Sequence, residues 1–110
     1  MDANLKAKWV EALRSGKYKQ GRNYLNSKGA FCCLGVLCDL SGEGKWELEL
    51  GADAFGDEMY RYLVGDGWNR ATLPPELAEK YGVHNPGPLI TMNDTGKSFT
   101  EIADYIEANL

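Results

Sequence analysis

The sequence predicts an α+β fold, a small single domain over residues 1–110 in which three to four short helices pack on a small antiparallel sheet of hairpins. Three observations lead to this prediction. Apolar residues recur at helical spacing near residues 5–13, 32–40 and 99–106. Residues 45–50 and 60–64 alternate between apolar and polar types, as half-buried strands do. The length of 110 residues and the 44% hydrophobic content suit one globular core.

The expected helices are defined mainly by their end signals. Asp2 can cap a first helix that runs to about Ser15, where Gly16 can adopt the left-handed conformation that ends it. The closing helix begins at the capping box formed by Ser98 and Glu101. Two further helices are expected over residues 32–40, before Ser41-Gly42, and over 75–81, after Pro74 and before Gly82.

Turn residues separate the expected strands. Asn26-Ser27-Lys28-Gly29 predicts a four-residue hairpin loop, and Gly65-Asp66-Gly67 predicts the turn of a second hairpin that ends near residue 71. A strand is expected over Lys45–Leu50. Residues 85–88 are expected to form a rigid turn, residues 89–92 an extended segment and residues 93–96 another turn.

All three cysteines lie in the segment Phe31–Leu40, at positions 32, 33 and 38. On a helix no two of them have the i, i+3 or i, i+4 spacing that converges on one ion, so no metal site is predicted. Cys32 or Cys33 could serve as a nucleophile if the helix start lowers the thiol pKa, with His84 as the base. The favoured interpretation is packing, in which the thiols are small apolar groups and Gly35 admits a close neighbour.

Charge is distributed unevenly along the chain. Residues 1–30 hold seven lysines and arginines against two acids, whereas residues 31–110 hold the other five cations and fourteen acids. The basic part can attract an anionic ligand locally, while the net charge of −4 repels nucleic acid at long range. The alternative, which we favour, is that the two parts neutralise one another in the fold.

The segment 17–24 is the best candidate for a ligand site. Its cations can contact phosphate, its tyrosines offer faces for base stacking, and Gly21 permits close backbone approach. The candidate residues are Lys17, Tyr18, Lys19, Arg22 and Tyr24. A plain solvated connection whose tyrosines pack inward is the alternative.

A second candidate lies at the start of the closing helix. Free amides at a helix N-terminus bind anions, and a neighbouring lysine adds positive charge. The candidate residues are Asn93, Asp94, Lys97 and Ser98. Ordinary turn and cap chemistry is the alternative. The acidic residues Asp104 and Glu107 make DNA binding by the closing helix an unfavourable interpretation.

Four motifs together resemble a family of small uncharacterised proteins of bacteriophages and prophages. They are the segment 9–21, the Phe-Cys-Cys-Leu-Gly-Val-Leu-Cys-Asp-Leu segment 31–40, Leu73-Pro74-Pro75, and the segment 93–104, Asn-Asp-Thr-Gly-Lys-Ser-Phe-Thr-Glu-Ile-Ala-Asp. The likeness is weakest between residues 41 and 71. It implies a phage accessory protein in the cytoplasm of a bacterial host, and it implies no activity.

From these observations we expect a non-enzymatic binding protein that sequesters a small anionic, nucleotide-like host signal and so blunts host defence. The alternatives are an inhibitor that docks on a host protein and a small cysteine-thiol enzyme. No cofactor, metal or membrane partner is predicted, because the chain holds neither a cofactor motif nor a run of about 18 apolar residues. A homo-oligomer is allowed, since small chains often complete a ligand pocket at a subunit interface. The odd number of cysteines and an N-terminus without an apolar signal region lead us to expect reduced thiols in a cytoplasm.

Overall fold

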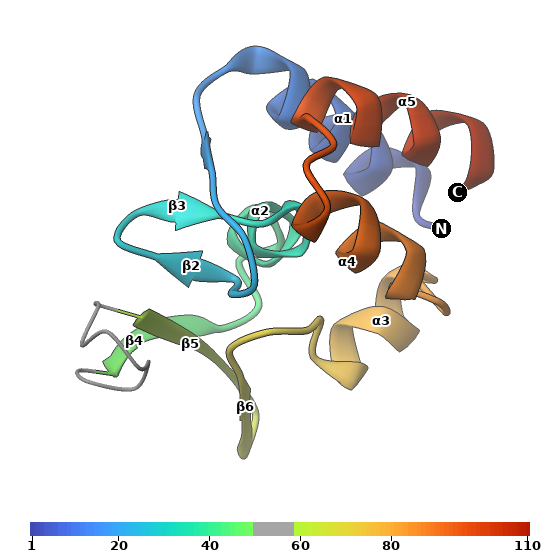
Figure 1. Ribbon diagram of the computed structural model, residues 1–110. Coiled ribbons are helices and arrows are strands. Elements are labelled where there is room, and N and C mark those ends of the chain that lie inside the picture. The colour runs from blue at the N-terminus through green and yellow to red at the C-terminus, as the bar shows by residue number, and fades with distance from the viewer. Residues whose placement is uncertain (50–58) are drawn as a thin grey trace.

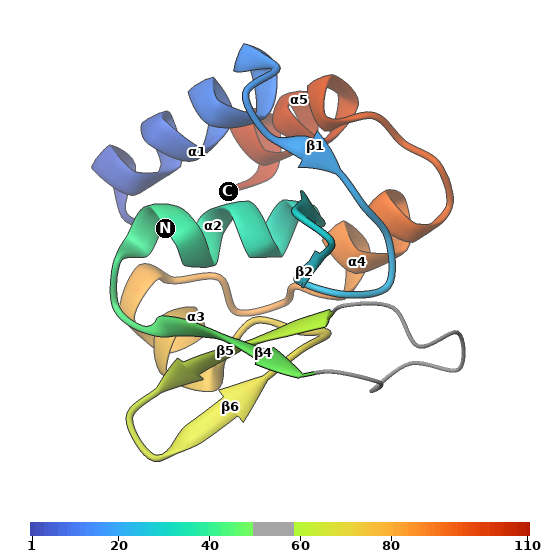
Figure 2. The same cartoon turned by 90° about the vertical axis from the view of Figure 1, so that its left-hand side faces the viewer.

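A computed structural model describes residues 1–49 and 59–110 of the chain, and these residues form one α+β unit. In both views a central helix, α2, lies between a layer formed by α1 and α5 and the strands β4, β5 and β6 (Figures 1 and 2). The elements are α1 Ala3–Ser15, β1 Lys19–Gln20, β2 Asn26–Ser27, β3 Ala30–Phe31, α2 Cys33–Ser41, β4 Lys45–Glu49, β5 Met59–Val64, β6 Gly67–Asn69, α3 Pro75–Tyr81, α4 Gly87–Asp94 and α5 Phe99–Asn109.

The predicted helix ends are confirmed at α1 and at the start of α5. The Asp2 carboxylate accepts a hydrogen bond from the Leu5 amide at 2.9 Å, and Gly16 ends α1 with a φ of 76°. The Ser98 hydroxyl accepts from the Glu101 amide at 3.2 Å. Because the cap residues satisfy amides that the helix itself leaves unpaired, they fix where each helix starts.

The sheet is mixed, so the expectation of a purely antiparallel sheet is wrong. The strand order is β1-β3-β2-β5-β4, with β6 also paired to β5. The pairs β2–β3, β2–β5, β4–β5 and β5–β6 are antiparallel, whereas β1 pairs with β3 in parallel. The chain reverses once between β1 and β2 and again at Lys28-Gly29, and two reversals leave β1 and β3 pointing the same way. The first hairpin is tighter than the predicted four-residue loop, because Asn26 and Ser27 belong to β2 and only Lys28 and Gly29 form the turn, with φ of 53° and 78°.

The predicted extended segment 89–92 is also wrong, because these residues lie within α4. Pro86 and Pro88 stand at the N-cap and in the first turn, where a missing N–H costs nothing. Leu89 and Asn93, one turn apart, are both buried and hold the helix against the core. The described residues consequently form five helices rather than three to four, and Asn93 and Asp94 end a helix instead of opening a turn.

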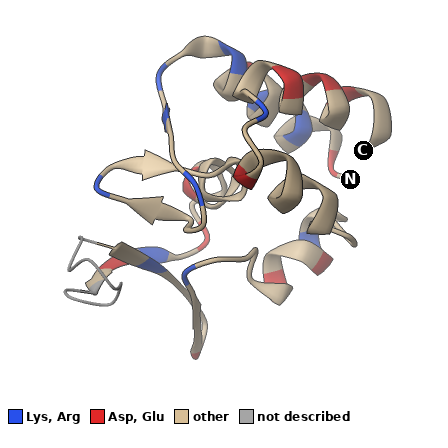
Figure 3. Ribbon diagram, in the orientation of Figure 1, with Lys and Arg blue, Asp and Glu red and all other residues tan. Residues whose placement is uncertain are grey.

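Opposite charges meet where α1 packs on α5 (Figure 3). Arg14 contacts Asp104 at 2.5 Å and Glu107 at 2.8 Å, and the Lys6 ammonium donates to the Glu107 carbonyl oxygen. Neutralisation between the two parts of the sequence therefore accounts for these cations. It does not account for the basic segment after α1, because Lys19 and Arg22 form no ion pair within the described residues.

Candidate functional site

The structure brings together the two segments that the sequence marked separately, 17–24 and 93–98. Gln20 makes the connection: its side-chain amide donates to the Asn93 side-chain oxygen at 3.1 Å and to the Lys97 carbonyl oxygen at 2.8 Å. Its side-chain oxygen accepts from the Phe99 amide at 3.2 Å. β1 is thereby fastened to the connection between α4 and α5.

Asn93 is the buried centre of this contact. Its side-chain oxygen also accepts from the Cys33 amide at 3.2 Å, and its side-chain nitrogen donates to the Gly21 carbonyl oxygen at 2.8 Å. The residue has no exposed surface. One carboxamide therefore joins α4, the start of α2 and the segment after β1, and a buried polar group with such partners specifies a single arrangement.

Cations gather around this contact. Arg22 is exposed, and its guanidinium lies beside Gly96, where an added Cβ would come within 3.4 Å of it. Lys97 follows Gly96 directly, and its ammonium is 3.7 Å from the Glu101 carboxylate. Asp94 lies nearby, and one of its oxygens accepts from the Asn23 amide at 2.9 Å. We call residues 19–23 with residues 94–98 the basic junction; Figure 3 shows blue segments on both sides of the red end of α4.

The predicted residues divide between this junction and other places. Those in or at the junction are Lys19, Arg22, Asn93, Asp94, Lys97 and Ser98. Lys17 instead borders a groove of about 810 Å³ along α1, together with Ala3, Ala7 and Val10. Tyr24 is half-buried and precedes Leu25, so it lies at the far end of the segment.

Tyr18 turns inward, as the alternative interpretation expected. Its ring packs edge-on against Phe31 with centroids 5.1 Å apart, and its hydroxyl donates to the Asp39 carboxylate at 2.6 Å. Burial, reinforced by this hydrogen bond, raises the pKa of Tyr18 to about 12. The ring is therefore part of the packing beneath the sheet rather than a stacking face at the junction.

The start of α5 is occupied by the protein's own side chains. Gln20 satisfies the Phe99 amide and Ser98 satisfies the Glu101 amide, which is the cap chemistry of the alternative interpretation. Any anion at the junction would consequently be held by the Arg22 and Lys97 side chains more than by helix amides.

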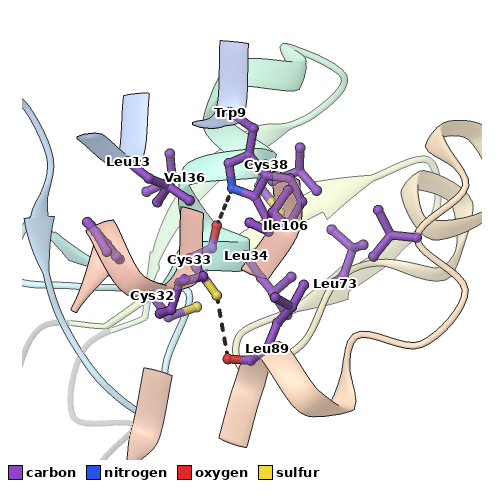
Figure 4. Packing of buried hydrophobic residues seen from close by; sticks show 14 of the residues in the cluster. Trp9, Leu13, Cys32, Cys33, Leu34, Val36, Cys38, Leu73, Leu89 and Ile106 are labelled. Carbon is purple, nitrogen blue, oxygen red and sulfur yellow. Dashed lines mark hydrogen bonds between the residues drawn. The ribbon is translucent and has the colours of Figure 1, made fainter. Parts of the chain in front are cut away.

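The cysteines lie in the core (Figure 4). Cys33 and Cys38 are fully buried, and Cys32 caps α2 with its sulfur 3.4 Å from the Gly35 amide. Burial raises the pKa of Cys32 to about 11, and it also raises the pKa values of Cys33 and Cys38 above that of an ordinary thiol. Desolvation thus outweighs the helix start, which was expected to lower these pKa values, and His84 stands exposed on the surface.

The packing role predicted for Gly35 is confirmed. A Cβ at this position would overlap the carbonyl oxygen of Leu25. The same helix start is held by Trp9, whose indole nitrogen donates to the Cys33 carbonyl oxygen at 2.9 Å (Figure 4). Through these contacts α2 packs closely against α1 and against the backbone at Leu25.

Sequence reasoning missed one surface feature, Trp68. Its side chain is 47% exposed, and the guanidinium groups of Arg61 and Arg70 lie 5.2 and 5.7 Å from its ring centre. We call these three residues the Trp68 row. The signal was present in the predicted hairpin, since an indole at position 68 and an arginine at position 70 share one face of a strand.

The described residues contain neither a cluster of metal ligands nor a helix suited to crossing a membrane. Within residues 1–49 and 59–110, no three His, Cys, Asp or Glu side chains come together as metal ligands could. Over the same ranges, no helix combines the length and apolar character needed to cross a membrane.

Fold and site together define a small α+β domain with a buried polar contact beneath a basic surface. The chain belongs to the family described as Domain of unknown function (DUF8296), whose profile matches residues 1–110. No curated protein and no solved structure matches the chain.

Proposed function

We propose that this protein is a non-enzymatic binding protein that sequesters a small anionic, nucleotide-like molecule at the basic junction. The observation that carries the proposal is the placement of the Arg22 guanidinium beside Gly96, the residue that directly precedes Lys97, although 74 residues separate Arg22 from Gly96 in sequence. Two cations on adjacent backbone segments can hold one phosphate group through charge-assisted hydrogen bonds.

The hydrogen bonds beneath the junction support this role. Gln20 and Asn93 hold both backbone segments in place without using the Arg22 side chain. A site whose backbone is fixed before the ligand arrives loses less conformational entropy on binding. Arg22 forms no ion pair within the described residues, so an anion would not have to displace a carboxylate from it.

Two acidic residues at the junction, Asp94 and Glu101, oppose the binding of an anion. Glu101 competes for Lys97 from 3.7 Å, but both side chains are more than half exposed, and such pairs contribute little. Asp94 repels an anion, and the hydrogen bond that its oxygen accepts from Asn23 only partly offsets this charge. The junction therefore suits a ligand with a second recognition element, such as a base, better than bare phosphate.

The biological setting of the proposal comes from the sequence. The resemblance of segments 9–21, 31–40 and 93–104 to small phage proteins supports an accessory protein that acts in the bacterial cytoplasm against a host defence signal. Sequestration needs no catalytic group, and the buried thiols with raised pKa values supply no ready nucleophile.

Docking on a host protein is the second candidate, favoured by the groove along α1. Apolar side chains of Ala3, Ala7 and Val10 line it together with charged side chains of both signs, which are Lys6, Glu11, Arg14, Lys17 and Glu107. An exposed apolar groove with a charged border is typical of protein-binding surfaces. An Ala7→Glu variant should then lose capture of the host partner while keeping its ligand affinity at the junction.

Calorimetric titration with adenosine diphosphate tests the first candidate. Because a charge-assisted hydrogen bond contributes about 1.5–3 kcal/mol, Arg22→Ala and Lys97→Ala should each weaken binding roughly tenfold to a hundredfold. Lys8→Ala, which removes an exposed cation from α1, is the matched control and should leave affinity unchanged. Higher salt should weaken binding in the wild type.

Equal affinities for adenosine diphosphate in wild type, Arg22→Ala and Lys97→Ala would show that the ligand does not bind at the basic junction. Mass spectrometry of small molecules released from protein purified from bacteria would identify the natural ligand directly.

A further inference from the structure

Among the described residues, β4 forms an open edge of the sheet. It is the last strand in the strand order and pairs with β5 over five consecutive residues, Lys45–Glu49. Within residues 1–49 and 59–110, no backbone hydrogen bond joins β4 to any segment other than β5. The backbone N–H and C=O groups that point away from β5 can therefore pair with another strand.

One face of β4 is apolar and lies toward α2. Trp46 is on this face, because its indole nitrogen donates to the carboxylate of Asp39 in α2 at 3.1 Å. Leu48 follows Trp46 by two residues and so shares the face. Its side chain is 41% exposed, which leaves a large apolar group uncovered at the open edge.

The other face of β4 carries charges of both signs. Lys45 and Glu47 lie on it, since they alternate with Trp46 along the strand. Glu47 accepts a hydrogen bond from Arg61, its neighbour on β5, at 2.9 Å. Lys45 is exposed and forms no ion pair within the described residues. A cation and an anion therefore stand two residues apart at the open edge.

This pattern is complementary to itself when two β4 strands run antiparallel. If Trp46 lies opposite Trp46 of a second copy, Lys45 of each copy lies opposite Glu47 of the other. Twofold symmetry forms this ion pair twice. On the other face, Leu48 then lies diagonal to the Trp46 ring of the second copy, within reach of a large aromatic side chain. Both faces of β4 thus gain favourable contacts in one register.

Other registers of the same two strands are unfavourable. A slide of two residues in one direction places Lys45 opposite Lys45, and a slide in the other direction places Glu47 opposite Glu47. Like charges directly opposite each other on neighbouring strands are destabilising. A slide of one residue sets the apolar face of one copy against the charged face of the other.

We propose that the protein forms a twofold-symmetric dimer in which β4 pairs antiparallel with β4 of a second copy, with Lys45 opposite Glu47. The pairing joins two sheets into one and covers the open edge of each. The basic junction adjoins β1, at the other end of the strand order, so dimerisation does not depend on a ligand there.

Sedimentation equilibrium of the full chain tests the proposal. Wild type should contain a dimer whose fraction rises with protein concentration. Lys45→Glu should weaken dimerisation by about tenfold or more, because it replaces two pairs of opposite charge with two pairs of like charge. Lys8→Glu makes the same change of charge at an exposed position of α1, and as the matched control it should leave the dimer Kd within about twofold of wild type.

Mixing two charge variants tests the register itself. Lys45→Glu brings two acidic side chains to the interface, and Glu47→Lys brings two basic ones. Each variant alone should be mainly monomeric, whereas an equimolar mixture should form heterodimers in which both ion pairs are restored. Leu48→Ser should also weaken the wild-type dimer, and circular dichroism should show that every variant keeps its fold.

Three results would overturn the proposal: a wild-type monomer at all concentrations, a dimer that Lys45→Glu leaves intact, or a mixture of the charge variants that stays monomeric. None of them bears on the proposed function, which is tested separately by adenosine diphosphate binding to Arg22→Ala and Lys97→Ala.

Discussion

Truncation of Asn93 to alanine should destabilise the protein strongly. The substitution leaves the buried Cys33 amide and the part-buried Gly21 carbonyl oxygen without their partners, whereas Gln20 keeps its bond to Lys97. A buried group left unsatisfied costs about 1–3 kcal/mol, so the two together should lower the free energy of unfolding by about 2–6 kcal/mol. Domains of this size have a total stability of roughly 5–15 kcal/mol, so the loss is a large fraction of it.

Asn26→Ala is the matched control for this experiment. Asn26 is 7% exposed, but its side-chain oxygen has no hydrogen-bond partner among residues 1–49 and 59–110. Its removal therefore breaks no bond to that atom and should change stability by less than about 1 kcal/mol. Urea unfolding followed by circular dichroism measures both variants, and Asn93→Ala should also lower Tm by roughly 10 °C or more. Equal losses in the two variants would show that the Asn93 hydrogen bonds do not hold the junction together.

Three further predictions concern the core and its edge. Gly35→Ala should lower the free energy of unfolding by about 3 kcal/mol or more, or prevent folding, because the new methyl group meets the Leu25 carbonyl oxygen; a soluble variant with wild-type Tm would contradict this. Alkylation should label Cys38 slowly in the native protein and completely in urea, because burial raises its pKa; rapid native labelling would refute the packing role. Ultraviolet titration should find Tyr18 ionising near pH 12, with Asp39→Asn lowering that value toward 10. Because the folded pKa lies above the unfolded value, the stability from Tyr18 is complete below about pH 10 and is lost as the pH rises to about 12, and a flat stability profile over that range would contradict the assignment.

Local signals in the sequence predicted most helices and strands because those signals act within a few residues. Asp2, Gly16 and Ser98 place helix ends by satisfying amides or adopting a left-handed backbone, and neither effect needs a distant partner. The helix over 87–94 was missed because Pro86 and Pro88 suggest a turn when nothing else is known. The core contacts of Leu89 and Asn93 decide the conformation there, and those contacts are tertiary.

The candidate site was predicted in two halves and not as one place. Residues 17–24 and 93–98 each carry recognisable chemistry, but their contact runs through the Gln20 and Asn93 side chains, across 73 residues of sequence. Polar side chains have many alternative partners, including water, so spacing alone does not pair them. One clue was present, since Asn93 follows Leu89 by four residues and a polar residue at an apolar position indicates a buried hydrogen bond.

The position of Asn93 ties the stability of the fold to the geometry of the junction. The same carboxamide that satisfies the Cys33 amide in the core also fixes Gly21, next to Arg22. If the junction binds a ligand as proposed, a variant that loosens this contact should reduce the fraction of molecules in which the junction is formed, and the apparent affinity should fall by that fraction. Conversely, a ligand held by both cations favours the closed contact and adds about 2.7 kcal/mol of stability at a hundred times its Kd. This gain in stability is comparable with the loss expected for Asn93→Ala. Ligand binding and the Asn93 hydrogen bonds would therefore both shift the equilibrium between the formed and the open junction. An asparagine at position 93 can hydrogen-bond to both the Cys33 amide and the Gly21 carbonyl oxygen. An apolar residue at this position could pack in the core but could form neither hydrogen bond.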